Sequence, residues 1–282
     1  LNLWVDLLAT VLDVNSEKPS EDTYSHGHHE SVIRSHSWRS AENSCAFVLP
    51  HLRPGLSLLD VGCGPGTITV DLAKYVAPGR VLGIDRAETA VREARGLGVA
   101  DIEFRLGDAY DTGLESGSFD VVHAHQVLQH LSDPVRALRE WKRVLRGDGL
   151  LAVRDSDYGA FVWGPADPML DRWLSLYHQI TERNGVEADA GRLLKSWVRK
   201  AGFSQIECSS SNWTFADDDS RTLWGGTWAD RVLHSSYAEQ ALSYGLSTPE
   251  ELNAIAEAFR RWVADPDGVF IVVHAEVQAW NS

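Results

Sequence analysis

A glycine-rich turn between a buried apolar run and a helical segment constrains this chain most. Residues 58–61 read Leu-Leu-Asp-Val, residues 62–66 carry glycine at every second position, and residues 67–77 have the apolar spacing of a helix. Short apolar runs and helical segments then alternate along the chain, an order typical of right-handed βαβ units and a parallel sheet. The sequence therefore predicts a doubly wound α/β fold. Its first five strands are expected at residues 57–61, 81–85, 102–106, 119–124 and 150–154.

The second half is expected to add helices and two long strands. Helix-start signals, Asp or Thr followed by Pro, stand at 167–168 and 248–249. Residues 203–215 and 268–280 are predicted to form an antiparallel hairpin at the edge of the sheet, which makes a mostly parallel sheet of seven strands. Eight of the eleven tryptophans also fall in this half. Most are expected to fill a core and a few to line an acceptor pocket.

Charge and cysteine content exclude several classes of protein. Among 282 residues, 40 Asp and Glu outnumber 26 Lys and Arg, and the net charge of −14 disfavours nucleic acid and anionic membranes as partners. No stretch reaches the roughly 20 apolar residues of a membrane helix. The three cysteines, Cys45, Cys63 and Cys208, are far apart. This spacing excludes a disulfide scaffold and fits a reducing cytoplasm.

Three kinds of ligand compete for the glycine-rich turn, whose backbone N–H groups would approach a ligand at a helix N-terminus. A P-loop is excluded because no Lys follows Gly66. A dinucleotide fingerprint is weakened because Thr67 stands where Gly or Ala is required. The third ligand is a sulfonium nucleotide without phosphates, S-adenosyl-L-methionine.

The string from Leu58 to Gly66 resembles the first motif of class I S-adenosylmethionine-dependent methyltransferases. The resemblance covers about residues 24–155 and implies a Rossmann-like methyltransferase fold with this cofactor. It implies that Asp85 accepts the ribose hydroxyls and that Asp108 takes the adenine amino group, although a helix N-cap and a plain turn are their respective alternatives. The cofactor contacts implied in the core are Gly62, Cys63, Gly64, Gly66, Asp85, Arg86, Gly107, Asp108, Ala109, His125 and Gln126.

Residues 24–42 resemble the N-terminal lid of small-molecule methyltransferases. This resemblance implies that Tyr24 covers the cofactor near its sulfonium and that Arg39 pairs with its methionine carboxylate, with Trp38 as a further contact. His26, His28 and His29 also lie in this segment. No Asp, Glu or His triad with established spacing accompanies them, so no metal is expected.

Two histidines are the candidate catalytic residues. Methyl transfer is an in-line displacement that requires positioning and, for some acceptors, removal of a proton. His125 is expected in the loop that faces the methyl group, and His28 is the second candidate, while a lining role stays open for both. His130 is expected to support the following helix.

The lid and the Trp-rich half also resemble enzymes that methylate thiols of microbial dithiol natural products. This resemblance implies a small-molecule thiol acceptor. Methylation of oxygen, nitrogen or carbon in a secondary metabolite or quinone precursor stays open. Two other classes stay open as well: an NAD-dependent oxidoreductase would share the turn and Asp85, and a non-catalytic binding protein would lack an open acceptor cavity.

The expected organisation has four parts. Residues 1–23 are a leader and linker, and residues 24–56 form a helical lid. The cofactor-binding α/β core extends over residues 57–155. Residues 156–282 supply acceptor-side helical insertions and the final edge strands.

Overall fold

The structure is a computed structural model, and it describes residues 22 and 38–281. The predicted leader and the predicted site residues Tyr24 and His28 therefore lie outside the described residues. In the described part of the chain, no helix is long and apolar enough to cross a membrane. The predicted lid is described only from Trp38 onwards, where it contains α2 and the 3-10 helix η1, so the proposed division into four parts stays a prediction.

The chain folds into a mixed sheet with helices on both faces, as predicted. The strands are β1 (Leu58–Val61), β2 (Val81–Asp85), β3 (Ile102–Leu106), β4 (Phe119–His125), β5 (Leu145–Ser156), β6 (Val162–Gly164), β7 (Gln205–Phe215) and β8 (Val269–Trp280). The α-helices are α2 (Ala41–Ser44), α3 (Thr67–Val76), α4 (Glu88–Gly96), α5 (Pro134–Val144), α6 (Pro168–Arg183), α7 (Leu194–Lys200), α8 (Asp218–His234), α9 (Ser236–Ser243) and α10 (Pro249–Ala264). The 3-10 helices are η1 (Leu49–His51), η2 (Leu128–His130), η3 (Tyr158–Ala160) and η4 (Ala190–Leu193).

Strand order explains where a ligand site must form. Strands β3, β2, β1, β4 and β5 are parallel and adjacent in that order, and the antiparallel β8 follows β5. Because the chain reverses its direction of travel across the sheet between β1 and β4, a crevice opens at the carboxyl ends of these strands. The fold class is confirmed, and the sheet has one strand more than predicted.

The additional strand is β6, and its three residues are too few to produce a sequence period. It pairs with one edge of β8, the same edge that pairs with β5, while β7 pairs with the other edge. The two long strands predicted from the sequence are thus present and antiparallel. Only β7 lies at the edge, because β8 is inserted between β5 and β7.

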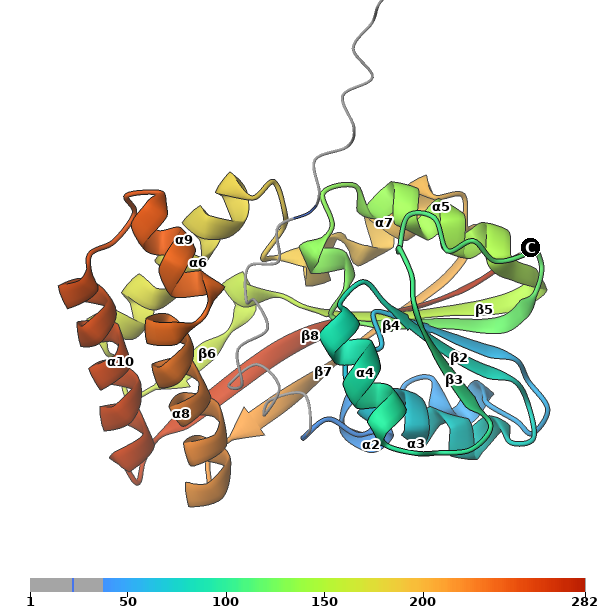
Figure 1. Ribbon diagram of the computed structural model, residues 1–282. Coiled ribbons are helices and arrows are strands. Elements are labelled where there is room, and N and C mark those ends of the chain that lie inside the picture. Colours follow the sequence, from blue (N-terminus) through green and yellow to red (C-terminus); the bar gives the residue numbers. More distant parts are fainter. Residues whose placement is uncertain (1–21, 23–37, 282) are drawn as a thin grey trace, which may run out of the picture.

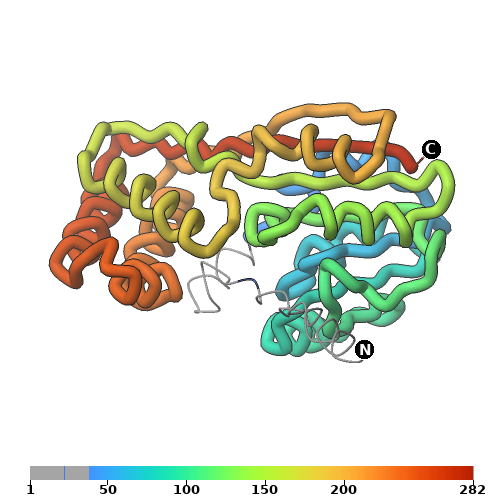
Figure 2. Tube along the Cα trace, turned by 90° about the horizontal axis from the view of Figure 1, so that it is seen from above, coloured from blue at the N-terminus to red at the C-terminus, as the bar shows by residue number. Residues whose placement is uncertain are grey.

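Helices cover the two faces of the sheet and form a second group beside it. Figure 1 shows α5 and α7 on one face and α2, α3 and α4 on the other. Helices α6, α8, α9 and α10 form what we call the helical group, whose core includes the fully buried Trp173 and Trp228. Figure 2 shows the sheet and the helical group side by side, joined by the long β8. Most of the tryptophans in this half pack in that core, as expected.

Candidate active site

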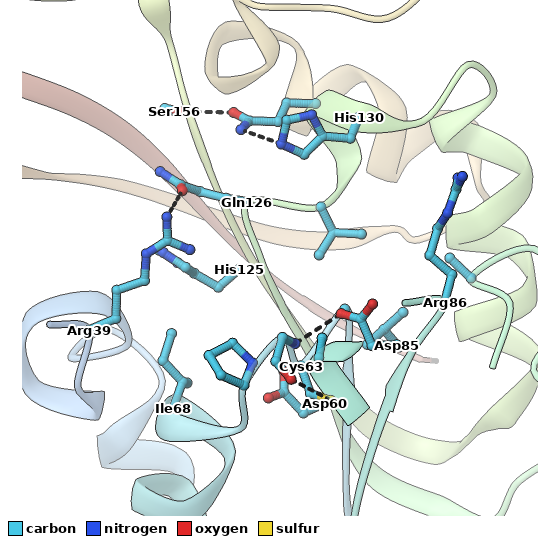
Figure 3. A pocket seen from close by; sticks show the side chains of 18 of the residues that line it. Arg39, Asp60, Cys63, Ile68, Asp85, Arg86, His125, Gln126, His130 and Ser156 are labelled. Carbon is cyan, nitrogen blue, oxygen red and sulfur yellow. Dashed lines mark hydrogen bonds between the residues drawn. The ribbon is translucent and has the colours of Figure 1, made fainter. Parts of the chain in front are cut away.

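A cavity of about 850 Å³ lies at the carboxyl ends of β1 to β4 and extends toward the helical group. Its size suits a cofactor-sized ligand together with a second small molecule. Figure 3 shows Asp85 and Arg86 on one side of it and Arg39, His125 and Gln126 on the other. The structure brings most of the predicted site residues to its wall: Trp38, Arg39, Gly62, Cys63, Gly64, Asp85, Arg86, Gly107, Asp108, Ala109, His125 and Gln126.

The glycine-rich turn forms the floor of the cavity. Gly62 has a φ of +70°, and a Cβ built on it would clash with the Val127 side chain. The backbone is therefore bare where it faces the cavity. Cys63 lines the cavity as a neutral thiol, since burial raises its pKa. Gly66 does not line it: a Cβ there would lie 2.8 Å from the Phe104 ring, so this glycine lets α3 and β3 pack closely.

The Asp85 carboxylate is fixed at the end of β2. Its Oδ2 accepts a hydrogen bond of 2.9 Å from the Gly64 N–H, and its Oδ1 accepts one of 2.9 Å from the Ala87 N–H at the start of α4. A carboxylate accepts about four hydrogen bonds. Asp85 therefore serves as a cap for the turn and retains capacity to accept hydrogen bonds from a ligand in the cavity.

A buried chain of hydrogen bonds anchors the turn from below. Asp60 Oδ1 is 2.7 Å from His123 Nδ1, its Oδ2 accepts a bond of 2.5 Å from Thr69 Oγ1, and His123 Nε2 is 3.1 Å from Cys45 Sγ. Burial disfavours the imidazolium, but the interactions with Cys45 and Asp60 outweigh burial and raise the pKa of His123 to about 10. A charged His123 donates at both ring nitrogens, which holds the Asp60 carboxylate in place.

The wall at the end of β3 includes one residue that the sequence did not indicate. Asp108 lines the cavity, and its Oδ1 accepts a hydrogen bond of 2.8 Å from the Tyr110 N–H. Asp22, predicted as part of a linker, is buried here. Its Oδ1 accepts from the Ser132 N–H and its backbone carbonyl accepts from Arg86 Nη2, at 3.1 and 2.8 Å.

His125 occupies the centre of the opposite wall. It ends β4 instead of lying in the following loop, it is only 6% exposed, and neither ring nitrogen has a hydrogen-bond partner among the described residues. Burial, with the nearby charges of Arg154 and Arg39, holds the pKa of His125 well below its usual range. The imidazole is therefore neutral, and its polar atoms are available to a bound molecule.

Gln126, next to His125 in the same wall, connects Arg39 to His274. Its Oε1 accepts a hydrogen bond of 2.7 Å from Arg39 Nη2, and its Nε2 is 2.8 Å from His274 Nε2. Since Arg only donates, the Gln126 amide must donate to His274 Nε2. Burial also lowers the pKa of His274, so this ring is neutral and its Nε2 is an acceptor.

His130, expected to support a helix, also lines the cavity. It belongs to a second polar chain, in which Ser156 Oγ donates to Gln129 Oε1 and Gln129 Nε2 is 3.0 Å from His130 Nε2. Burial and the charges of Arg39 and Arg86 lower the pKa of His130 to about 3. Figure 3 shows this chain across the cavity from the turn.

Comparison with known proteins assigns the chain to a family. A methyltransferase-domain family matches residues 59–153. An uncharacterized methyltransferase of Schizosaccharomyces pombe is 34% identical to this chain over 92% of it and 97% of that protein. The chain belongs to the class I S-adenosylmethionine-dependent methyltransferases.

Two further similar proteins match different shares of this chain. The nocamycin O-methyltransferase of Saccharothrix syringae is 42% identical to this chain. The match covers only 36% of this chain and 38% of the nocamycin enzyme. The crystal structure of the Bacillus subtilis YcgJ protein has a TM-score of 0.52 and 20% identity, over 90% of this chain and 98% of that one. At this identity the structural likeness supports the fold alone. Family membership selects the methyltransferase interpretation over the nicotinamide one.

The residues present fit S-adenosylmethionine, the cofactor of this family. The turn presents bare backbone at the floor of the cavity, and acidic side chains at the ends of β2 and β3 offer acceptors for hydroxyl and amino groups. Arg39 supplies a cation at the opposite wall. In the described part of the chain, no group of three or more His, Cys, Asp or Glu residues is placed to hold a metal ion.

Beyond His125 the cavity of the methyltransferase is lined mostly by aromatic rings. We call this half the aromatic chamber and define it by Tyr158, Phe161, Trp213, Phe215 and Trp224. Their rings pack against one another and against Phe270, as in the stacked pair Phe215–Trp224, whose centroids are 4.8 Å apart. The sequence predicts only that a few of the eight tryptophans in the second half of the chain line a pocket, and Trp213 and Trp224 line this cavity. Tyr158, Phe161 and Phe215 have no local signal, because η3 with the residue after it, β7 and α8 build the chamber from segments that are distant in the sequence.

Proposed function

We propose that this methyltransferase methylates a small molecule bound in the aromatic chamber, at a thiol or hydroxyl group. The observation that carries the proposal is His125. A buried imidazole with two unsatisfied nitrogens is costly unless a ligand completes its hydrogen bonds. His125 stands where the wall of predicted cofactor contacts meets the aromatic chamber, 5.6 Å from Trp213 between ring centroids.

The residues would divide the work of binding as follows. Gly62, Gly64, Asp85 and Asp108 would hold the cofactor, which supplies an electrophilic methyl group on a sulfonium when bound. Arg39 would bind its methionine carboxylate. The lid residues Tyr24, Trp38 and His28 are proposed to close over the site, although Tyr24 and His28 lie outside the described residues.

The acceptor side relies on positioning. The rings of the aromatic chamber exclude water and restrict the acceptor to a few orientations, which is a large part of catalysis for an in-line displacement. A ring nitrogen of His125 contacts the acceptor oxygen or sulfur. Resemblance to thiol methyltransferases supports sulfur as the acceptor atom, while the name of the related nocamycin O-methyltransferase supports oxygen.

The remaining features favour a small acceptor over a macromolecule. A net charge of −14 opposes binding of nucleic acid, and three widely spaced cysteines support a cytoplasmic location. The open cavity beside the turn also disfavours a purely cofactor-binding role.

Methyl transfer is tested with S-adenosylmethionine that carries a deuterated methyl group. The protein is incubated with matched aryl thiols, phenols and amines, and products are analysed by mass spectrometry. We expect labelled thioether or ether products that require the protein. Label that enters only amines, or none of the panel despite tight cofactor binding, would contradict the proposal.

A further inference from the structure

Two guanidinium groups lie against the same indole beside His125. The Arg39 guanidinium is 5.4 Å and the Arg154 guanidinium 4.9 Å from the centroid of the Trp213 ring, which in turn is 5.6 Å from the His125 ring. Arg154 is fully buried, and its Nη1 and Nη2 have no hydrogen-bond partner among the described residues. A molecule at His125 therefore meets a cationic environment with little water to screen it.

The other charged and titratable groups around His125 do not reverse this environment. Glu276 lies 3.4 Å from Arg154 Nε and also accepts hydrogen bonds from Ser209 and Ser211. Burial raises the pKa of Asp155 to about 8, so this carboxyl is mostly protonated at neutral pH. His274 is neutral, and the charge of His123 faces the Asp60 carboxylate.

The aromatic chamber itself is also a cationic environment. Arg231 of α8 lines the cavity on this side. The carboxylates in the described lining, Asp22, Asp60, Asp85, Glu93 and Asp108, come from the segments that bound the opposite half. A cationic amine would thus add a charge of the same sign beside these arginines, an unfavourable arrangement. An anion would be stabilised.

A neutral His125 in this setting is a poor base. Accepting a proton would place a further cation, itself buried, beside the half-buried Arg39 and the buried Arg154, at a large desolvation cost. Donating a hydrogen bond carries no such cost, because a neutral imidazole always has one N–H. The geometry therefore favours His125 as a hydrogen-bond donor over His125 as a general base, two roles that the sequence alone does not distinguish.

We propose that the methyl acceptor binds as an anion, a phenolate or aryl thiolate with its ring in the aromatic chamber, and that His125 donates a hydrogen bond to it. This inference rests on the proposed function. The acceptor loses its proton to solvent as it binds. Its oxygen or sulfur then forms a bond to the methyl carbon while the carbon–sulfonium bond breaks, and that electron pair stays on the departing sulfur. One anion and one sulfonium give two neutral products, so no base is needed during transfer.

The ionisation state is tested without turnover. 4-Nitrophenol, which absorbs visible light only when ionised, is titrated with pH in the presence of protein and S-adenosylhomocysteine. We expect its acid dissociation constant to rise about tenfold or more when bound, and His125→Leu to remove most of that rise, since a hydrogen bond to a charged group is worth about 10- to 100-fold. A benzylamine control is expected not to compete.

Two further variants separate a donor from a base. His125→Asn and His125→Gln keep an N–H near the position of one ring nitrogen or the other. At least one of them is expected to retain the spectral shift and methyl transfer within about tenfold, whereas loss of a base costs about 10²–10⁴-fold. Calorimetry with S-adenosylhomocysteine confirms that each variant folds and binds the cofactor product.

The outcomes are distinct. If the unmodified protein does not bind S-adenosylhomocysteine, the proposed function fails. If it binds but 4-nitrophenol stays protonated, if benzylamine competes equally, or if both amide variants lose as much as His125→Leu, this inference alone is overturned.

Discussion

At the scale of single residues, buried charges hold the floor of the cavity in place before any ligand binds. The chain from Cys45 through His123 to Asp60 is almost completely buried. Its polar atoms satisfy one another, which is the condition for a stable buried polar chain. It links α2 to the floor of the cavity, so its ionisation affects both stability and the shape of the turn.

His123 predicts a pH dependence of stability. Its pKa is raised from an ordinary 6.5 to about 10 in the folded protein. A raised pKa stabilises the fold fully below the unfolded value, and that stabilisation is lost as the pH rises through the folded value. The free energy of unfolding by urea should therefore fall between about pH 7 and about pH 10.5 by more in the unmodified protein than in His123→Asn. Equal losses would show that His123 does not titrate in this range.

Asp85 predicts an effect on affinity. Replacing it with Ala removes acceptors for ligand hydroxyls, so S-adenosylhomocysteine should bind about 1–3 kcal/mol more weakly by calorimetry. Glu115→Ala makes the same change in charge at an exposed position outside the cavity and should leave binding unaltered. Equal affinities for the two variants would remove Asp85 from the cofactor site.

Much of the cavity wall at the strand ends could be predicted from the sequence, and little of the aromatic chamber. Gly62, Asp85 and Asp108 follow strands whose ends can be predicted from the sequence. The carboxyl ends of parallel strands lie at the same edge of a sheet, so these residues are expected to lie close together. Trp213 and Trp224 are different. They reach the cavity through a strand and a helix whose positions depend on long-range packing, and aromatic residues in those elements are equally common in a core.

At the scale of elements, local signals located most helices and strands, and long-range pairing decided the rest. Pro after a capping residue marks the starts of α5, α6 and α10. β6 has no local signal in the sequence because it is only three residues long. The interior place of β8 depends on pairing with residues more than 100 positions away, which no local pattern encodes.

The glycine-rich turn offers a matched test at this scale. Gly62 and Gly98 have similar backbone angles, φ +70° and +63°, but a Cβ at Gly98 would meet nothing within 4 Å. Both Ala variants incur about 1–2 kcal/mol for the left-handed backbone. The clash with Val127 should lower the free energy of unfolding of Gly62→Ala by about a further 1–3 kcal/mol. It should also weaken binding of S-adenosylhomocysteine. Equal unfolding free energies for the two variants would contradict the tight packing of this turn.

At the scale of the whole molecule, β8 joins the two cores. Its Phe270 packs in the core of the helical group, and its Val277 packs in the core between the sheet and α5. A strand shared in this way couples the two parts, so unfolding should be a single cooperative transition.

This coupling is tested with two probes. Tryptophan fluorescence reports mainly the second half, where eight of the eleven tryptophans lie, and far-ultraviolet circular dichroism reports the whole chain. The two denaturation curves should coincide. Phe270→Ala should lower the free energy of unfolding obtained from each curve by about 3–5 kcal/mol. Separate midpoints, or a shift in fluorescence alone, would show that the helical group unfolds independently.

One cavity is proposed to hold the cofactor at the strand ends and the acceptor against the aromatic rings. A crystal structure with S-adenosylhomocysteine tests it most directly. We expect its ribose at Asp85, its adenine near Asp108 and its sulfur on the side of the cavity that faces His125 and Trp213. Binding elsewhere, or a sulfur turned away from His125, would contradict it.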